Sequence, residues 1–468
     1  MLIRSLIAVL LVSAYPSAQA DEVVRPLIER GAWRDAQIRV YDRVWVKHQT
    51  PEIAISMACS GFPDLALLRA KDVPAVSRSY VLSTIGTDCL SLTISQRTNI
   101  LDVALRTTTD PEQRIWIALA WLRLGKPDQA IAIARRALHE AQGSGQYTRR
   151  IIDTLARSQE ASFVTSLAQE LVQFAHAMPS DNDPYIYIGL ARLLGLARDE
   201  KGQKAALYDA AQRVAFLQVG QRPNALSAMV EVALSGDQAA LAASITPQSN
   251  VPMQWVDYYA RHADYKTAEA LTEGMSDTLY VSRRLASLST IIHRAVENRD
   301  MKVASDLTER LLKTGSDYTL FQMIIGNAYC NADQQAEAST AYARGVARYL
   351  RLDQAYYSEY DVRVLAQLSQ AARYNGQPKI ADLVMGLMPT LISKIYPKNL
   401  EGQVLSRVYF AKLLNEQGDR DAASIRLIEA NELLTASPET EKRLSYTRLE
   451  LALAEGLHSE FGLEVIGR

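Results

Sequence analysis

The sequence predicts an all-α protein built from helical hairpins that stack into a solenoid. Apolar residues recur at spacings of three and four in 115–124, 285–296 and 403–414, which is the period of one helix face. Runs of Val, Ile and Thr bounded by turn residues, which would indicate strands, are scarce. Short turns also recur along the chain at a nearly constant interval, and such a period is typical of a repeat protein.

The recurring unit is a turn residue followed five positions later by a small residue. The clearest turns are at Gly31, Gly61, Gly125, Ala263, Arg299, Asp333, Gly376 and Gly418, and the small residues are Ala36, Ala66, Ala130, Ala268, Ala304, Ala338, Ala381 and Ala423. Weaker turns are expected at Gly202 and Gly236, where Leu207 and Leu241 replace the alanine. Two longer gaps leave room for hairpins near residues 91 and 159. Twelve turns between 31 and 418 then give a mean interval of about 35 residues.

These offsets have a physical rationale, because a small residue after the turn lets the second helix pack closely on the first. An aromatic residue four positions before the turn fills the space between them. The best copy contains Gly326, Tyr329, Asp333, Ala338, Tyr342 and Gly345. The pattern resembles the tetratricopeptide-repeat family over most of 24–435, most strongly near 114–138 and 256–345. The resemblance implies a right-handed superhelical solenoid of about 12 hairpins.

The N-terminus carries the features of a secretory signal peptide. Arg4 supplies a positive charge, Leu6 to Val12 form a short apolar core, and Ala18-Gln19-Ala20 resembles a cleavage site before Asp21. The apolar run is about half the length that a membrane-spanning helix needs. No Cys lies near the cleavage point to carry a lipid. We therefore predict a signal peptide at 1–20 and a periplasmic protein without stable membrane insertion.

A break in the repeats is expected at Pro179-Ser180-Asp181-Asn182-Asp183-Pro184, where two prolines bracket polar turn formers. It predicts two arrays of repeats, residues 21–178 and 185–468. A calcium loop at Asp181 and Asp183 is disfavoured, because the required Gly and terminal Glu are absent. The chain is expected to end in a capping helix near 439–459 with a polar outer face.

Three cysteines are too few for a disulfide framework. In an exported protein, Cys59 and Cys89 could form a disulfide and leave Cys330 free. Alternatively, all three are small buried apolar residues. We favour the second interpretation, because nothing in the sequence fixes the distance between the two sulfurs.

The composition and motifs favour a binding protein over an enzyme. A net charge of −1 lacks the basic excess that broad nucleic-acid binding requires. The zinc, phosphate-loop, dinucleotide and serine-hydrolase motifs are all missing from the sequence. We expect no catalytic residue, no metal and no cofactor.

By the resemblance, residues six, three and two positions before each turn should face the concave groove. In the C-terminal half these positions are mostly polar. The partner-binding candidates are Asp257, Arg261, His293, Asn327, Asn331, Gln370, Arg373, Lys412 and Asn415. In the copy that turns at Gly125 the equivalent positions are Leu119, Leu122 and Arg123. The polar wall indicates hydrogen bonding to a peptide segment, with Arg373 and Lys412 available to an anionic group.

Tyr356, Tyr357 and Tyr360 are expected to cluster on one helix before Asp361. They suit either an interface or partly exposed helix packing, and we favour packing. The sequence thus predicts an exported scaffold or adaptor that binds a protein partner in an envelope assembly, secretion, motility or polysaccharide-export system. The alternative is a cell-wall glycan-binding or glycan-cleaving protein.

Overall fold

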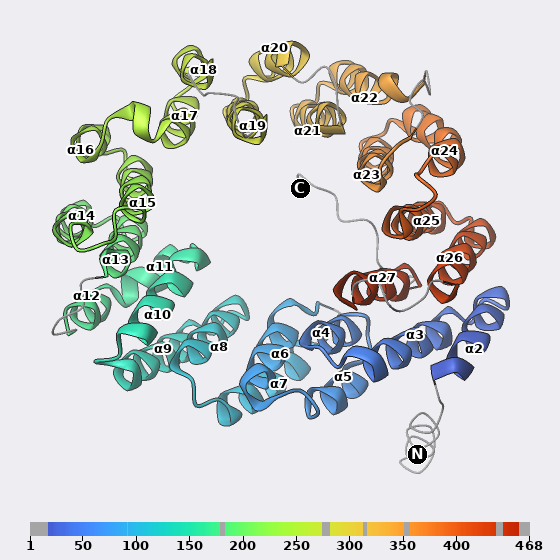
Figure 1. The fold of residues 1–468 in the computed structure, drawn as a ribbon, viewed down its shortest axis with the longest axis horizontal. Coiled ribbons are helices and arrows are strands. Elements are labelled where there is room, and N and C mark those ends of the chain that lie inside the picture. Colours follow the sequence, from blue (N-terminus) through green and yellow to red (C-terminus); the bar gives the residue numbers. More distant parts are fainter. Residues whose placement is uncertain are drawn as a thin grey trace. The chain divides into compact units, whose positions relative to one another are not determined.

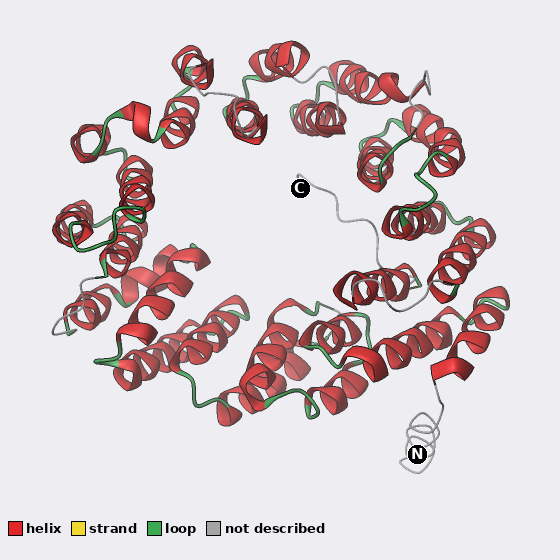
Figure 2. Cartoon of the chain, in the orientation of Figure 1, coloured by secondary structure: helices red, strands yellow, loops and turns green. Residues whose placement is uncertain are grey.

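The computed structural model describes residues 17–90, 92–177, 183–273, 281–311, 316–350, 356–436 and 443–457. These residues form α-helices and one short 3-10 helix, and they contain no β-strand (Figures 1 and 2). The predicted fold class, an all-α solenoid of helical hairpins, is confirmed. The signal-peptide prediction lies mostly outside the described residues, and Asp21 lies within the first described helix, Ser17–Glu29.

The chain divides into two compact units. Unit 1 combines residues 1–56 with 295–468, and unit 2 is the continuous segment 57–294. The predicted division into 21–178 and 185–468 differs from this one, because 178 and 185 both fall inside unit 2. Helices on the two sides of that break pack together in unit 2, as described below, so the proline-bracketed turn does not separate two cores.

The helices of unit 2 have the following bounds: α5 Pro63–Ala70, α6 Ala75–Asp88, α7 Ile94–Thr107, α8 Pro111–Arg123, α9 Pro127–Ala141, α10 Gly145–Ser158, α11 Ala161–Ser166, α12 Ala168–His176, α13 Pro184–Leu196, α14 Glu200–Val214, α15 Arg222–Ser235, α16 Ala239–Ile245, η1 Gln248–Asn250, α17 Pro252–Arg261 and α18 Tyr265–Glu273. Helices α4 (Pro51–Cys59) and α19 (Val281–Glu297) contain the boundaries between the units.

Unit 1 contains helices from both ends of the chain. Their bounds are α2 Ser17–Glu29, α3 Trp33–His48, α20 Met301–Leu311, α21 Ser316–Asn331, α22 Gln335–Leu350, α23 Glu359–Tyr374, α24 Pro378–Ser393, α25 Leu400–Glu416, α26 Arg420–Thr435 and α27 Arg443–Gly456.

Two kinds of contact build each unit. Consecutive helices pack as hairpins, including α6 with α7, α8 with α9 and α13 with α14 in unit 2, and α21 with α22, α23 with α24 and α25 with α26 in unit 1. The first helices of neighbouring hairpins also pack on each other, in the series α6, α8, α10, α13, α15, α17 and the series α21, α23, α25, α27 (Figure 1). Each hairpin therefore buries its apolar face against its neighbours, as in a repeat protein.

The predicted turns explain how the hairpins close. All eight of the clearest turn residues have a left-handed backbone, with φ between 57° and 84°. The alanine five positions after each of them is fully buried. At Gly326 a Cβ atom would lie 2.5 Å from the ring of Tyr342, so the glycine permits close packing between α21 and α22. The repeated turn and alanine thus serve packing, as the sequence predicts.

The sequence predicts the positions of the weaker turns less accurately. Gly202 lies inside α14, where its N–H donates to Asp199 Oδ1 at 2.8 Å, and the left-handed residue is Arg198 instead. The turn expected at Gly236 has its left-handed residue at Asp237. The turn near 159 is confirmed, because Gln159 has a φ of 56°. Residue 91 lies outside the described residues, between α6 and α7.

Asp183 caps the start of α13. Its carboxylate accepts a hydrogen bond from Tyr185 N at 2.9 Å and forms an ion pair with Arg149 Nη1 of α10 at 3.1 Å. Residues 178–182, which include the proposed Asp181, lie outside the described residues. Helices α10 and α12 both pack on α13, which joins the segments before and after the predicted break.

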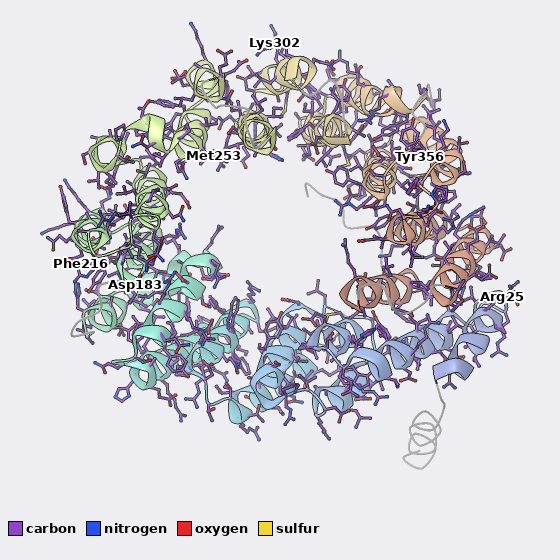
Figure 3. All side chains as sticks on the ribbon, viewed as in Figure 1. Arg25, Asp183, Phe216, Met253, Lys302 and Tyr356 are labelled. Atoms are coloured by element: carbon purple, nitrogen blue, oxygen red, sulfur yellow. A yellow bond between two sulfur atoms is a disulfide. The ribbon has the colours of Figure 1, made fainter. Side chains whose placement is uncertain are left out.

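The expected tyrosine cluster is not on one helix. Tyr356 and Tyr357 precede α23, and Tyr357 is buried with its N–H donating to Lys394 O at 3.1 Å. Tyr356, labelled in Figure 3, is exposed. Its ring packs edge-on against Tyr396, with ring centroids 5.2 Å apart. Tyr360 lies in the first turn of α23, and its hydroxyl donates to Asp317 Oδ1 at 3.3 Å. A Tyr357→Ala change would therefore disturb the core of unit 1, so it is unsuitable as a test of an interface.

Candidate binding site

The predicted groove residues of α17 take part in an ion-pair network that reaches α19. Asp257 binds Arg294 Nε of α19 at 2.8 Å and Arg261 Nε at 3.4 Å. Arg261 also donates to the carbonyl of Leu234 on α15 at 3.0 Å. His293 is exposed on α19. Asp257 and Arg261 therefore connect three successive first helices, and their charges already have partners within unit 2.

Asn327 does not line a surface, which corrects the sequence prediction. Its side chain is 7% exposed, and its Oδ1 accepts hydrogen bonds from Tyr342 OH at 2.6 Å and Asn375 Nδ2 at 3.2 Å. Asn375 Nδ2 also lies 2.7 Å from Tyr342 OH, so two successive hairpins share one polar cluster. Burial raises the pKa of Tyr342. Asn331, at the end of α21, is exposed.

Gln370 and Arg373 on α23 contact neighbouring helices. Gln370 Nε2 donates to Glu416 Oε1 of α25 at 2.9 Å. Arg373 is exposed and forms an ion pair with Asp382 of α24, with 2.6 Å between Nη2 and Oδ1. Asn415 is half-buried on α25. Most of the nine predicted residues thus form separate contacts with neighbouring residues.

Lys412, one of the nine partner-binding candidates, lines a pocket that we call the terminal pocket. This terminal pocket has a volume of about 400 Å³. It is lined by Thr50, Glu52, Leu405, Val408, Tyr409, Lys412, Arg448, Leu451, Ala452 and Glu455. All of these residues belong to unit 1.

Two helices supply the walls of the terminal pocket. Residues 405, 408, 409 and 412 share one face of α25, and residues 448, 451, 452 and 455 share one face of α27, because each set follows the helical spacing of three and four. The apolar floor is ringed by charges of both signs. Lys412 Nζ lies 3.9 Å from Glu455 Oε2, and Arg448 Nη1 donates to Glu401 Oε1 at 2.9 Å.

Tyr409 supplies a hydroxyl group to the terminal pocket. Burial raises the pKa of Tyr409, although the nearby guanidinium groups of Arg363 and Arg448 act in the opposite direction. Tyr409 therefore stays protonated at neutral pH and can donate a hydrogen bond. The terminal pocket thus combines an apolar floor with a phenol donor and with cationic and anionic groups.

Contacts between the two ends of the chain hold the pocket together. Arg43 on α3 binds Glu450 on α27, with 2.5 Å between Nη2 and Oε2, and it donates to Asn431 Oδ1 on α26 at 3.2 Å. The Arg43 and Glu450 side chains are 1% and 0% exposed. We call these three residues the terminal clasp. The clasp fixes α27 against α3 and thereby fixes one wall of the terminal pocket.

Further contacts near the clasp join the same elements. Trp33 Nε1 donates to Ser424 Oγ at 3.1 Å, and the Arg420 guanidinium lies 4.6 Å from the centre of the Trp33 ring. Arg25 of α2, labelled in Figure 3, forms an ion pair with Glu432 of α26 at 2.5 Å. The helix expected near 439–459 is present as α27, but its expected polar outer face is not, because α27 packs against α3 as well as α25 and α26. Residues 437–442, with the proposed helix start, lie outside the described residues.

Sequence reasoning missed the terminal clasp because its members are 388 and 407 positions apart. A weak signal was present: Arg43 lies among Val40, Tyr41, Val44 and Trp45, although Arg39 and Asp42 lie in the same segment. A buried arginine requires a partner. Glu450 lies in an equally apolar stretch, so the two charges were candidates for pairing.

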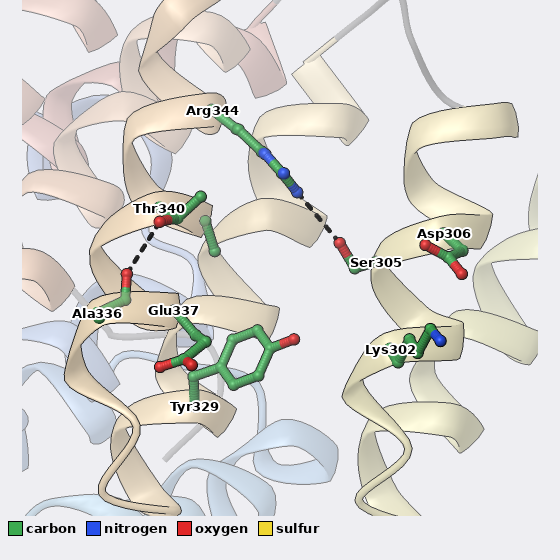
Figure 4. A pocket seen from close by; sticks show the side chains of 9 residues that line it. Lys302, Ser305, Asp306, Tyr329, Ala336, Glu337, Thr340 and Arg344 are labelled. Atoms are coloured by element: carbon green, nitrogen blue, oxygen red, sulfur yellow. Dashed lines mark hydrogen bonds between the residues drawn. The ribbon is translucent and has the colours of Figure 1, made fainter.

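A smaller charged pocket of about 350 Å³ lies between α20, α21 and α22 (Figure 4). Its walls carry Lys302, Asp306, Glu337 and Arg344, and Arg344 Nη1 donates to Ser305 Oγ at 3.3 Å. A third pocket, of about 210 Å³, lies between α6 and α8 in unit 2. It contains Leu119 and Arg123, two of the positions that the sequence placed in the N-terminal part of the groove.

The described residues hold no group of three or more His, Cys, Asp or Glu side chains arranged to bind a metal ion. In the same part of the chain, every helix is too short or too polar to cross a bilayer. Cys59 and Cys89 form a disulfide, which corrects the favoured interpretation of three unpaired cysteines. Cys330 is a free thiol of intermediate exposure.

Comparison with family models and with curated proteins gives no match. Among solved structures, a monomeric mutant of IFIT1 with m7Gppp-AAAA has 12% sequence identity and a TM-score of 0.25, covering 89% of this chain and all of the other. A circular tandem repeat protein has 14% identity and a TM-score of 0.17, covering 94% and 91%. Likenesses this weak carry no argument about this chain. Its own helices and contacts define it as an all-α helical-repeat protein.

Proposed function

We propose that this chain is an exported periplasmic scaffold of the tetratricopeptide type, without catalytic activity, that binds a segment of a partner protein. It would act in an envelope assembly, secretion, motility or polysaccharide-export system. The terminal pocket is the single observation on which this proposal rests. Its apolar floor suits an aliphatic or aromatic side chain, and its rim offers hydrogen-bonding groups of both charges to the flanking peptide.

The repeat geometry supports the assignment to the tetratricopeptide type. The eight clearest turns have left-handed residues, and the alanine that follows each of them is buried. The series of first helices in each unit has the arrangement from which such repeats build a binding face. A repeat scaffold uses this face for recognition because its core is already occupied by packing between hairpins.

The disulfide supports the proposal of export. Disulfides persist in oxidising compartments such as the bacterial periplasm and are rare in the cytosol. The Cys59–Cys89 bond therefore agrees with the signal-peptide features of residues 1–20. Edman sequencing or intact-mass measurement of the secreted protein would test export, with Asp21 expected as the first residue.

Filling the terminal pocket would test the binding proposal. Ala452→Phe adds a ring inside the pocket without changing any charge, since Ala452 lines it from α27. Ala240→Phe is the matched control, because Ala240 is exposed on α16 in unit 2. The chain without residues 1–20 and both variants would be used to capture proteins from an envelope extract, followed by mass spectrometry. Circular dichroism would establish that all three proteins are folded.

We expect a specific protein to be retained by the native chain and by Ala240→Phe, and lost with Ala452→Phe. Equal retention by all three proteins would show that the partner does not use the terminal pocket. Capture of no protein by the native chain would contradict the scaffold proposal.

A further inference from the structure

The pocket between α6 and α8 has a different character from the terminal pocket. It is lined by Tyr80, Ser83, Thr84, Thr87, Asp88, Trp116, Leu119, Ala120 and Arg123. All of these residues belong to unit 2. From this set we propose that the pocket binds one uncharged sugar ring of a glycan. We call it the α6–α8 pocket.

Two aromatic side chains stand at one end of the α6–α8 pocket. Trp116 is 40% exposed and Tyr80 is 47% exposed. The other four tryptophans of the chain, Trp33, Trp45, Trp121 and Trp255, are at most 4% exposed. Large aromatic rings are normally buried because of their apolar area. A flat aromatic face beside polar groups suits the apolar C–H face of a pyranose ring.

The opposite end and the wall of the pocket are polar. Residues 83, 84, 87 and 88 share one face of α6, which therefore presents three aliphatic hydroxyl groups and a carboxylate. Ser83 Oγ donates to Tyr80 O at 2.9 Å, and Thr87 Oγ1 donates to Ser83 O at 2.7 Å. Their oxygen lone pairs remain able to accept hydrogen bonds. Thr84 has no side-chain hydrogen bond to any described residue, so its hydroxyl can also donate.

Arg123 and Asp88 form a charged pair that adds further hydrogen-bonding groups to the pocket. Arg123 Nη1 and Asp88 Oδ1 are 3.8 Å apart, and their side chains are 48% and 58% exposed. An exposed pair at this distance contributes little to stability, so its groups can turn toward a ligand. Together they supply donors and an acceptor, and sugar hydroxyls need both. Because the two charges cancel, the pocket favours an uncharged ligand over an ionic one.

The walls of the pocket are held in place before a ligand arrives. Ser79 on α6 and Thr108 both bond to Gln113 Oε1 on α8, the latter at 2.9 Å. At the other end of α6, Arg97 Nε donates to Gly86 O at 2.8 Å. The next residue after α6 is Cys89, which the disulfide joins to Cys59. A site with fixed walls loses less entropy on binding.

The size of the pocket favours a sugar ring over an extended peptide. Its volume of about 210 Å³ is below the range of roughly 300–1,000 Å³ that is typical of pockets for drug-sized ligands. One ring fits such a space, whereas a peptide segment needs a groove that continues past it. A glycan can place one ring in the pocket while its other rings stay in solvent.

The exposed tryptophan provides a direct measurement. Acrylamide quenches exposed tryptophans, so quenching of the full chain reports mainly on Trp116. We expect chitotetraose, cellotetraose or maltotetraose to protect Trp116 from quenching in a saturable manner. Isothermal titration would give the dissociation constant for the same sugar. Protection by none of the three sugars, with no heat of binding, would overturn the proposal.

Three variants locate the site. Trp116→Ala should raise the dissociation constant roughly tenfold or more, because it removes the stacking surface. Trp116→Tyr keeps an aromatic face and should restore most of the affinity. Tyr208→Ala, at a tyrosine that is 56% exposed on α14 in the same unit, should leave binding unchanged. Thermal unfolding of each variant would identify any that fails to fold. If Trp116→Ala is among them, the affinity of Trp116→Tyr is compared with that of the native chain instead.

Two other results would also overturn the proposal. Equal affinity of the native chain and Trp116→Ala would place the sugar elsewhere. Protection of Trp116 by uncharged peptides but by none of the sugars would assign the pocket to a protein partner.

Discussion

The two units of this protein fix their ends in different ways. Unit 2 is one continuous segment with a disulfide near its first residues, which joins the end of α4 to the end of α6. Unit 1 is assembled from both ends of the chain and holds them together with the noncovalent terminal clasp. A repeat array can therefore stabilise its terminal hairpins in two ways. It can use a disulfide, or it can use noncovalent contacts between its first hairpin and its last helices.

The largest expected effect comes from breaking the terminal clasp. Glu450→Leu leaves Arg43 charged and buried without its carboxylate, and loss of one partner of a buried pair costs about 3–5 kcal/mol. The free energy of unfolding should fall by this amount, with hydrogen exchange rising in α3 and α27. Urea titration followed by hydrogen-exchange mass spectrometry would measure both changes.

A double variant separates charge from packing at the clasp. Arg43→Met/Glu450→Leu removes both charges and keeps similar side-chain volumes, so it should recover most of the lost stability. If the double variant were as unstable as Glu450→Leu, the clasp would owe its effect to shape rather than to an unpaired charge. Unchanged stability in both variants would show that the clasp does not hold unit 1 together.

Removal of the disulfide should have a somewhat smaller effect, and in the other unit. In the chain-entropy model, a cross-link that spans 30 residues stabilises by about 3–4 kcal/mol. Cys59→Ser/Cys89→Ser should therefore destabilise α6 and α7 and leave exchange in α25 to α27 unchanged. Cys330→Ser is the control, since that thiol is free. Equal loss of protection in both units would contradict the separation between them.

A third expectation concerns alkaline pH and unit 1. Burial, followed by the hydrogen bond to Glu309, raises the pKa of Tyr318 to about 12, and burial also raises the pKa of Tyr342 and Tyr349. A folded state that holds these protons more tightly than the unfolded chain is stabilised below the ordinary tyrosine pKa of about 10. That stability is lost as the pH rises through the folded pKa values.

Urea titrations at increasing pH would measure this loss, which should begin above pH ~10. Tyr318→Phe should make the free energy of unfolding fall less steeply with pH, because one of the shifted groups is gone. A slope that is the same in the variant and the native chain would contradict the assignment to Tyr318. A loss that begins well below that pH would point to groups other than tyrosines.

The repeat fold was predictable because its determinants are local. A turn residue and an alanine five positions later are close in sequence, and the structure confirms both at each of the eight clearest turns. Where the expected turn residue was Gly202, the prediction was wrong, since Asp199 caps α14 and places the glycine in its first turn. Glycine alone did not distinguish a helix start from a left-handed turn.

The sites were less predictable because they depend on distant residues. Asn327 has the spacing of a groove residue, yet Tyr342 and Asn375 from later helices cover it. The terminal pocket requires α3 to meet α27, and no period in the sequence encodes that contact. The Cys59–Cys89 pair was one of two open interpretations, because the distance between the two sulfurs follows only from the packing of α4 and α6.

The split of unit 1 across the sequence also sets an order of events during synthesis. Unit 2 is complete once Arg294 has been made, because all of its residues come before that point. Arg43 cannot form its ion pair until Glu450, 407 residues later, has been synthesised. The first hairpin therefore emerges from the ribosome long before its partner helices exist. Unit 2 can therefore fold as soon as its own residues have been made, whereas unit 1 can close only after Glu450 has been added.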